Sequence, residues 1–470
     1  MSELEAPPAA VSDDGARRRE QRGWMFYDWA NSVFPTSIVT VFLSLYLTEI
    51  AETAATADTA RNGPAPCPDG DVLRDCDVSI VGLTFPAGAL WGYLLSIATV
   101  VLVLVLPITG AIADRTQNKR RMLGIFAFSG AVFTVLLALV AGDNWKLGVL
   151  LFILANGSYG ASVVIYYAFL PEIAGPDERD ALSTRAWAFG YLGSGTALTL
   201  QLAVFLAHES LGLTEGEAVR FCFVMSGLWW AAFTLIPLGR LRRHQAPHGA
   251  EHGVSTLRAG FVELRSTLRQ ARAFPLTLAF LGAYLVYTDG ISTVANVAGQ
   301  YGDRELHLPR EVLITTILLV QFVAFFGGVL HGLVARRLGA KRTIMVSLLM
   351  WIVVVAAAFF VRENDRWQFY GVAVGIGIVL GGTNALSRSL YSQMVPPGRE
   401  AQYFSLYEIG ERSTSWLGPL VFAGVGQATG SFRLAIISLV AFFVVGFVLV
   451  ALVPVRRAIQ AVGNPVPAVL

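Results

Sequence analysis

The sequence predicts an all-α, polytopic membrane protein with twelve transmembrane helices in two pseudo-symmetric six-helix bundles. Three observations predict this class. Of the 470 residues, 54% are hydrophobic and only 14% are charged, so a soluble core could not bury the apolar surface. The apolar residues fall into twelve stretches, each long enough to cross about 30 Å of hydrocarbon at about 1.5 Å per residue. A charged motif after the second stretch has a weaker copy after the eighth, which indicates repeated halves.

The motif lies where a long apolar run stops at one acid and four cations. Residues 107–121 read PITGAIADRTQNKRR, in which Gly110 allows a neighbouring helix to approach closely and Asp114 lies at the helix end. In residues 332–342, GLVARRLGAKR, the glycine and the paired cations recur, but Arg336 stands where Asp114 stood. We therefore expect Asp114, and not Arg336, to brace against the positive end of the eleventh span.

The order of the elements follows from these runs. We expect a disordered cytosolic tail over 1–22, which lacks the apolar segment of a cleavable signal peptide. The N-terminal bundle covers 23–238, a cytosolic linker 239–274, the C-terminal bundle 275–454 and a cytosolic tail 455–470. The twelve expected spans are 24–49, 87–113, 122–141, 147–170, 186–207, 219–238, 275–298, 311–334, 343–361, 367–390, 403–426 and 433–453.

The distribution of cations predicts the orientation of the chain. Placing both tails and the alternate loops on one side collects 26 Lys and Arg, including Arg388 and Arg412 near span ends, and leaves nine on the other. The positive-inside rule therefore makes both termini cytosolic. Arginine supplies 32 of the 35 cations, a bias typical of GC-rich bacterial genomes, so we expect a bacterial inner (plasma) membrane. Because the cations are not gathered in one stripe, nucleic acid is not an expected partner.

The longest external loop, at about 51–86, contains Cys67 and Cys76. Its exposure to an oxidising compartment allows a Cys67–Cys76 disulfide, which would stabilise the fold by about 2–3 kcal/mol in the chain-entropy model. Two free thiols are the alternative. Metal binding there is disfavoured because no His or third Cys lies nearby.

The linker has a helical pattern, since Leu257, Phe261, Leu264 and Leu268 recur at helical spacing beside arginines. This pattern is typical of an amphipathic helix on the inner leaflet, and a linker helix packed under the bundles is an equal alternative.

Three linker histidines, His244, His248 and His252, are spaced four apart as helical metal ligands often are. Pro247 and Gly249 interrupt the helix that such a site would need, so no metal site is predicted.

Polar residues within the spans mark the candidate site, because each must be paired or must face water. They concentrate in the first and fourth spans of each half, as expected if those helices line a shared aqueous cavity. The residues are Asp28, Asn31 and Ser32; Asn156, Tyr159, Ser162 and Tyr166; Asp289, Ser292 and Asn296; and Asn384, Ser387, Arg388 and Tyr391. For any one of them, interhelical packing is the structural alternative.

From this set we predict two groups of functional residues. The substrate or coupling residues are Asp289, Asn31, Asn156, Tyr159, Tyr166, Ser292, Asn296 and Asn384, and the gating residues are Asp28, Asp114, Arg115 and Arg388. Asp289 lies about 21 Å along a span that starts at Pro275, where it either binds a substrate amino group, carries the coupling proton or is structural. Asp28 and Arg388 form either an inner gate or a structural ion pair of about 0–1 kcal/mol.

The twelve spans and the Gly-x-x-x-Asp-Arg motif with its echo resemble the major facilitator superfamily. Within it, the chain resembles the vacuolar effluxer-like family of fungal autophagy-related amino-acid effluxers and bacterial relatives, from about residue 24 to 452. The segments that carry the resemblance are YDWANS (27–32), LPE (170–172), GYLG (190–193), YTDG (287–290), ALSRS (385–389) and GP (418–419).

The resemblance implies a monomeric secondary active transporter, without cofactor or catalytic residues, that works by alternating access in a lipid bilayer. We expect efflux of a small polar solute, such as an amino acid, coupled to protons. The rival interpretations are a membrane enzyme, a non-transporting sensor, and a transporter of an unrelated substrate such as a drug or sugar. An enzyme would need a nucleophile with a base or a metal cluster at membrane depth, and the sequence offers neither.

Overall fold

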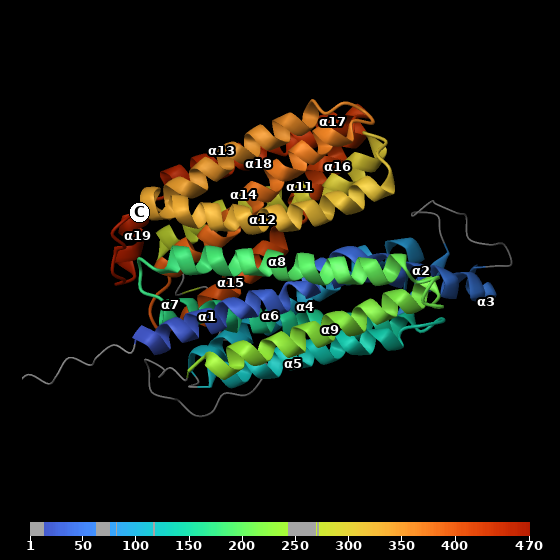
Figure 1. Cartoon of the computed structure of the whole chain (residues 1–470), viewed down its shortest axis with the longest axis horizontal. Helices are drawn as coiled ribbons and strands as arrows, with labels where there is room; N and C mark the ends of the chain where they lie inside the picture. The colour runs from blue at the N-terminus through green and yellow to red at the C-terminus, as the bar shows by residue number, and fades with distance from the viewer. Residues whose placement is uncertain (1–13, 63–75, 81, 116–117, 243–268, 270–271) are drawn as a thin grey trace, which may run out of the picture.

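The computed structural model describes residues 14–62, 76–80, 82–115, 118–242, 269 and 272–470. Within them the chain forms two helical bundles packed side by side, the N-terminal one in blue to green and the C-terminal one in yellow to red (Figure 1). Eleven helices of the described part are long and apolar enough to cross a membrane. The predicted all-α, multi-spanning class is therefore confirmed.

The N-terminal bundle is built from long helices joined by short turns. Its helices are α1 (Asp14–Asn31), η1 (Phe34–Phe42), α2 (Leu43–Ala57), α3 (Thr59–Asn62), η2 (Ala87–Ala89), α4 (Leu90–Arg115), α5 (Lys119–Leu136), η3 (Leu137–Leu139), α6 (Trp145–Ala168), α7 (Leu170–Ile173), α8 (Arg179–Leu206) and α9 (Glu215–Arg240). A small antiparallel hairpin of β1 (Asp77–Ile80) and β2 (Leu83–Pro86) precedes η2, with Val78 opposite Phe85.

The C-terminal bundle repeats this plan. Its helices are α11 (Pro275–Arg304), α12 (Arg310–Leu338), α13 (Ala340–Phe359), α14 (Arg366–Gln393), α15 (Glu400–Thr414), α16 (Leu417–Thr429), α17 (Phe432–Ser438), α18 (Val440–Leu452) and α19 (Val455–Ala461). The bundles meet where α8 packs on α12 and α14, and where α15 packs on α4 and α6. The starts of α1 and α7 lie with α19 at one end, here named the terminal end, whereas α2, α3 and α17 lie at the other, the open end (Figure 1).

Helix 1 of the bundle is one continuous span, Asp14–Ala57, with an unusual middle. Over Phe34–Phe42 its backbone is a π-helix, in which the N–H of Leu43 still reaches back five residues to the carbonyl of Ile38. Pro35 explains this winding, because its ring removes one i→i−4 hydrogen bond and clashes with the carbonyl four residues earlier. The Thr40 hydroxyl donates to the Pro35 carbonyl at 2.9 Å, also across five residues. Such π-helical insertions are frequent at functional sites.

The expected span 403–426 is not one helix but two, α15 and α16, separated at Ser415–Trp416. The break is explained by Pro419, which has no N–H for the Ser415 carbonyl four residues earlier and sits in the first turn of α16, where proline is tolerated. Each piece is too short to cross alone, which is why eleven uninterrupted spans and not twelve are found in the described part.

The N-terminal tail differs from the expectation. Residues 14–22 are helical rather than disordered, because Gln21 donates to the Ile173 carbonyl at 2.9 Å and the buried Glu20 accepts from the Arg242 backbone N–H. The C-terminal tail is docked: Asn464 donates to the carbonyls of Gln393 and Val395 at 2.8 Å each. Residues 1–13, the predicted amphipathic helix and the three linker histidines lie outside the described residues.

Candidate functional site

A cavity of about 460 Å³ lies between the two bundles. It is lined by α1, η1, α4, α6 and α8 from the N-terminal bundle and by α11 and α15 from the C-terminal bundle. Six predicted site residues line it: Asp28, Asn31, Asn156, Tyr159, Ser292 and Asn296. The first and fourth spans of the N-terminal half and the first span of the C-terminal half therefore meet around one space, as their polar faces predicted.

The charges at the centre of this cavity come from α15, which the sequence analysis did not single out. Glu408, Glu411 and Arg412 line the cavity, with the consecutive Glu411 and Arg412 one helical turn after Glu408. Arg412 Nε lies 3.5 Å from Glu408 Oε2, and its guanidinium lies 5.6 Å from the Tyr159 ring centre. Arg412 was counted as a near-terminal cation, but it stands twelve residues into α15, about 18 Å along the helix.

Glu411 has a different set of partners from Glu408. Its Oε2 accepts the Tyr284 hydroxyl hydrogen at 2.6 Å, and the Tyr284 ring stacks on Tyr407 at 4.2 Å. Arg412 Nη1 donates to Asn156 Oδ1 across the bundle interface at 3.5 Å, so one side chain from each bundle meets here. The cavity thus presents a guanidinium and a carboxylate side by side, with amide and phenol groups around them.

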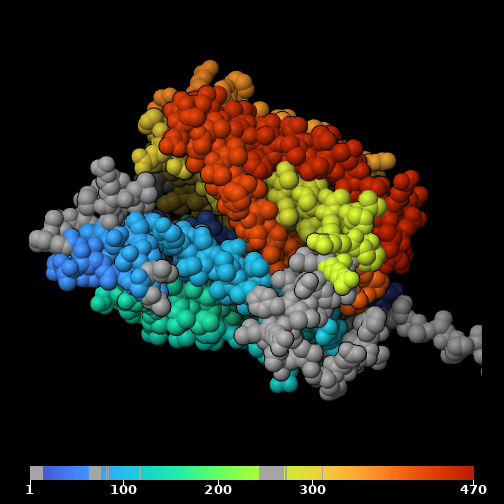
Figure 2. Space-filling model, turned by 180° about the vertical axis from the view of Figure 1, so that it is seen from behind, coloured from blue at the N-terminus to red at the C-terminus, as the bar shows by residue number. Residues whose placement is uncertain are grey.

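A second cavity of about 640 Å³ adjoins the first toward the open end, and shares Pro35, Thr36 and Asn296 with it. Its other walls are mainly apolar and come from η1, α12 and α14. In the space-filling view a hollow separates the blue N-terminal bundle from the orange C-terminal bundle (Figure 2). The π-helical segment η1 lines both cavities, so it faces the route between the open end and the central charges.

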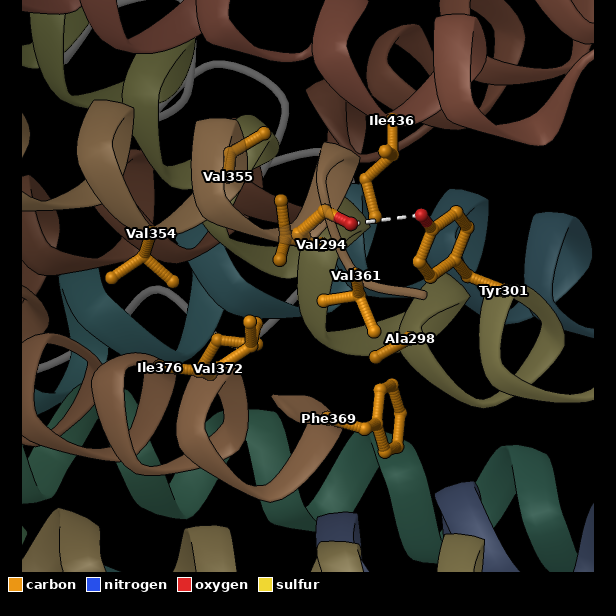
Figure 3. Close-up of a pocket in the computed structure, with 11 residues that line it drawn as sticks. Val294, Ala298, Tyr301, Val354, Val355, Val361, Phe369, Val372, Ile376 and Ile436 are labelled. Carbon is orange, nitrogen blue, oxygen red and sulfur yellow. Dashed lines mark hydrogen bonds between the residues drawn. The ribbon is translucent and has the colours of Figure 1, made fainter. Parts of the chain in front are cut away.

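Figure 3 shows a smaller cavity of about 20 Å³ inside the C-terminal bundle. Its lining is apolar apart from Tyr301, whose hydroxyl donates to the Ala358 carbonyl at 2.8 Å. With that hydroxyl already bonded, this space offers no free polar group for recognition, and it is a packing gap rather than a candidate site.

Asp289 does not line either central cavity and is only 2% exposed. Its Oδ2 accepts the backbone N–H of Gly418 at 2.8 Å, so the carboxylate caps the first turn of α16. The expectation that Asp289 lies in the central cavity is therefore wrong. The reason is the break in the eleventh span, which places a helix N-terminus inside the bundle next to α11.

Tyr166 and Asn384 are likewise outside the lining of the central cavity. The Tyr166 ring stacks on Trp24 at 4.4 Å, and Asn384 Oδ1 lies 3.5 Å from the Thr288 hydroxyl. The tenth span thus contributes its polar residues to packing and to the terminal end, whereas the eleventh supplies the charges of the cavity.

Asp28 and Arg388 are paired, with 3.2 Å between Asp28 Oδ2 and Arg388 Nη1. The pair is not at the surface: Arg388 is fully buried, and its remaining nitrogens donate to the hydroxyl and carbonyl oxygens of Ser183 at 2.9 and 3.0 Å. Four aromatic rings surround the guanidinium, those of Trp24, Tyr166, Tyr167 and Trp187, at 4.8–5.7 Å. The pair closes the cavity on the side of the terminal end.

The terminal end is closed by contacts between the bundles. Asp114 accepts the backbone N–H groups of Ala401 and Gln402 at 2.9 and 2.8 Å, as the expected brace on the eleventh span requires. Lys119 lies 3.5 Å from Asp114 and 3.9 Å from Glu400, and so joins the two bundles. Arg115 is the exposed last residue of α4. With this end closed and the hollow at the other, the structure is open toward one side only.

Of the cysteines, Cys76 is disulfide-bonded and Cys222 is a buried free thiol. Cys67 lies outside the described residues, so its pairing with Cys76 stays a prediction. Among the described residues no cluster of three or more His, Cys, Asp or Glu could hold a metal ion.

Comparison with known proteins identifies the chain. The family model described as "Vacuole effluxer Atg22 like" matches residues 16–463. The chain belongs to this family. Like the other Atg22-like proteins it is a multi-pass transporter of the major facilitator superfamily and not an enzyme.

The Atg22-like relatives extend over nearly the whole chain. An uncharacterized MFS-type transporter of Bacillus subtilis (strain 168), YxiO, is 27% identical over 439 residues, covering 93% of this chain and 95% of the relative. Autophagy-related protein 22-2 of Emericella nidulans is 26% identical over 546 residues, covering 94% and 91%.

Among solved structures, the human organic anion transporter MFSD10 (TETRAN) matches with a TM-score of 0.67 at 14% identity, covering 95% of this chain and 100% of that one. This likeness shows the shared fold alone.

Proposed function

We propose that this Atg22-like protein is a secondary active transporter that exports a small zwitterionic solute, of which amino acids are the simplest class. The observation that carries the proposal is the adjacent Glu411 and Arg412 in the central cavity. A guanidinium suits a carboxylate, which it can bind through two parallel hydrogen bonds. A carboxylate hydrogen-bonded to a phenol suits an ammonium group.

In the proposed mechanism the solute carboxylate binds Arg412 and Asn156, and its ammonium group binds Glu411. The aromatic wall of Tyr159 and Tyr191 lines the same space and limits access of water. Because the site lies between the bundles, rocking one bundle against the other exposes it to either side in turn. The contacts of Asp114 and of the Asp28–Arg388 pair must then break when the terminal end opens.

Proton coupling is proposed for the carboxylates of α15 in place of Asp289. Glu408 and Glu411 are one turn apart with one guanidinium between them, so both cannot be neutralised by Arg412. A proton on one of the two carboxylates makes the net charge of Glu408, Glu411 and Arg412 zero, which is favoured in a low-dielectric space. Release of that proton and of the solute can then be linked within one cycle.

The terminal end is proposed to face the cytosol of a bacterial cell, with the open end outside. The excess of cations in the tails and alternate loops supports this orientation. The monomer is the proposed functional unit, since one chain builds the whole cavity.

The test is transport by the purified chain in proteoliposomes, against a panel of amino acids and with or without a pH gradient. Arg412→Gln and Glu411→Gln should each abolish gradient-driven uptake of the substrate found. Arg304→Gln is the matched control, because Arg304 is 72% exposed and outside the cavity. Failure of every amino acid on the panel, or normal transport by Arg412→Gln, would contradict the proposal.

A second candidate substrate is an amphipathic organic solute such as a drug, which the mainly apolar cavity of about 640 Å³ favours. Including such compounds in the panel separates the two. An amphipathic substrate would depend on the apolar wall at Val320 and Leu380, whereas a small zwitterion would not.

A further inference from the structure

The break in the eleventh span creates a polar site inside the C-terminal bundle, apart from the transport cavity. Asp289 on α11 binds the N–H of Gly418 through Oδ2, but its Oδ1 is buried and has no hydrogen-bond partner among the described residues. A charged group at membrane depth normally has a partner. Oδ1 is therefore a buried charged oxygen without the hydrogen-bond donor or cation that would stabilise it.

Thr293 lies one turn further along α11 and has the same property. Other buried threonines of the described helices have a hydrogen-bond partner: Thr134, Thr234 and Thr343, for example, donate to their own helix four residues back. The Thr293 hydroxyl makes no hydrogen bond within the described part of the chain, although the residue is only 1% exposed. Its oxygen lies against Gly418, where a Cβ would come within 2.0 Å of it.

Asp289 and Thr293 lie one turn apart on α11, and both contact Gly418 of α16, Asp289 through Oδ2 and Thr293 through its hydroxyl side. A carboxylate and a hydroxyl are hard oxygen ligands, and the break leaves the Ser415 carbonyl without the backbone donor four residues on, because Pro419 has no N–H. In discontinuous membrane helices such unwound carbonyls and half-helix ends coordinate cations. Because the site holds a single carboxylate, one positive charge balances it.

We propose that Asp289 Oδ1 and Thr293 Oγ1 form part of a binding site for an alkali-metal cation at the break between α15 and α16. The cation neutralises the carboxylate that caps α16, and thereby holds α11 against the two half-helices. This site is separate from the cavity that contains Glu411 and Arg412, so it does not depend on which solute is transported.

The test is the thermal stability of the purified full-length protein in detergent, without substrate, at fixed pH and ionic strength. NaCl, LiCl and KCl are each titrated against choline chloride. A ligand that binds only the folded state raises the unfolding temperature in a saturable way. We expect at least one alkali cation to do so for the wild type, and choline to have no effect.

Variants assign the effect to the site. Asp289→Asn should abolish the cation-specific stabilisation, and Thr293→Val should raise the half-saturating concentration at least tenfold. Thr343→Val is the matched control, since its buried hydroxyl bonds its own helix, and it should titrate as the wild type does. If Asp289→Asn does not fold, the salt titrations of Thr293→Val and Thr343→Val still test the proposal, because only Thr293→Val should bind the cation more weakly.

Three outcomes would overturn the proposal. One is an equal response to every salt, choline included. Another is a cation response that survives in Thr293→Val and Asp289→Asn. The third, seen when the salt titrations are repeated at a lower pH, is stabilisation by acid alone, equal in all salts and lost in Asp289→Asn, which would give the site to a proton.

Discussion

Arg388 of α14 and Asp28 of α1 come from different bundles and meet at 3.2 Å at the bottom of the transport cavity. The guanidinium also donates two hydrogen bonds to Ser183 and is surrounded by four aromatic rings. The pair is therefore a buried interaction, and not the exposed kind that contributes little.

Removal of either charge should destabilise the protein, because it leaves the other buried without a partner. We expect Asp28→Asn and Arg388→Gln each to cost about 3–5 kcal/mol and to abolish transport. The double neutral variant should cost less than the sum of the two. A double-mutant cycle by thermal unfolding measures the coupling, which should reach about 0.5–3 kcal/mol. Additive effects would contradict a direct pair.

Asp114→Asn should favour opening of the terminal end. The amide keeps one acceptor oxygen, but its NH2 group faces the N–H groups of Ala401 and Gln402, and the charge is lost. A hydrogen bond to a charged group contributes about 1.5–3 kcal/mol, which is about ten- to a hundredfold in the closed-to-open ratio. Accessibility of single cysteines on either side of the contact reports this ratio. Arg336→Gln, at the equivalent exposed position, should leave it unchanged.

Gly110→Ala should produce the same shift without changing any charge. A Cβ at this position would come within 2.6 Å of the Ala401 carbonyl oxygen, so α4 and α15 must separate. Overpacking of this kind costs about 1–3 kcal/mol. Gly92→Ala in the same helix is the control, because nothing lies within 4 Å of its Cβ position. Equal cysteine accessibility in the two variants would show that the close approach is unimportant.

Glu411→Gln and Tyr284→Phe test the division of roles on α15. If Glu411 carries the coupling proton, Glu411→Gln should lose uphill transport and keep exchange of solute across the membrane. Tyr284→Phe removes the hydroxyl that donates to Glu411 and should shift the pH dependence of uphill transport without abolishing it. Loss of both uphill transport and exchange in Glu411→Gln would instead support the proposed binding of the solute ammonium group by Glu411 and leave the coupling proton to Glu408.

Gly418→Ala should destabilise the C-terminal bundle by about 1–3 kcal/mol, because its Cβ would meet the Thr293 hydroxyl at 2.0 Å. Gly424→Ala lies in the same helix with nothing within 4 Å of its Cβ position, and it should be neutral or slightly stabilising. Thermal unfolding of the two variants compares them directly. If both behave alike, the contact between α11 and the start of α16 is loose.

Most of the membrane-spanning helices could be predicted because the length of an apolar stretch is a local property of the sequence. The polar faces of Asn31 and Asn156 also followed from helical spacing, and both residues line the cavity. The break at Ser415–Trp416 was missed because residues 403–426 have the length of a full span, and a proline such as Pro419 can also kink a membrane helix without ending it.

Because the break was not predicted, the charged residues of the site were expected on α11 and not on α15. Without the break, Asp289 had no apparent partner and was assigned to the cavity, and Arg412 was taken as a cation near the end of its span. The three charged residues Glu408, Glu411 and Arg412 inside one expected span were the available signal. Whether a charged residue lies near the end of a span or deep in the membrane depends on where its helix begins. Because α15 begins at Glu400, at the terminal end, Arg412 lies twelve residues into the helix.

The π-helical turns of Phe34–Phe42 have a consequence for how helix 1 moves. If Phe34–Phe42 changed from π-helical to α-helical hydrogen bonding, α2 would rotate about the helix axis relative to α1. Helix 1 can therefore twist about its own axis at Phe34–Phe42, in addition to the rocking of the bundles. Spin labels at the exposed Arg22 and Glu49 would report that twist separately from labels placed on α5 and α13, which follow the rigid bodies alone.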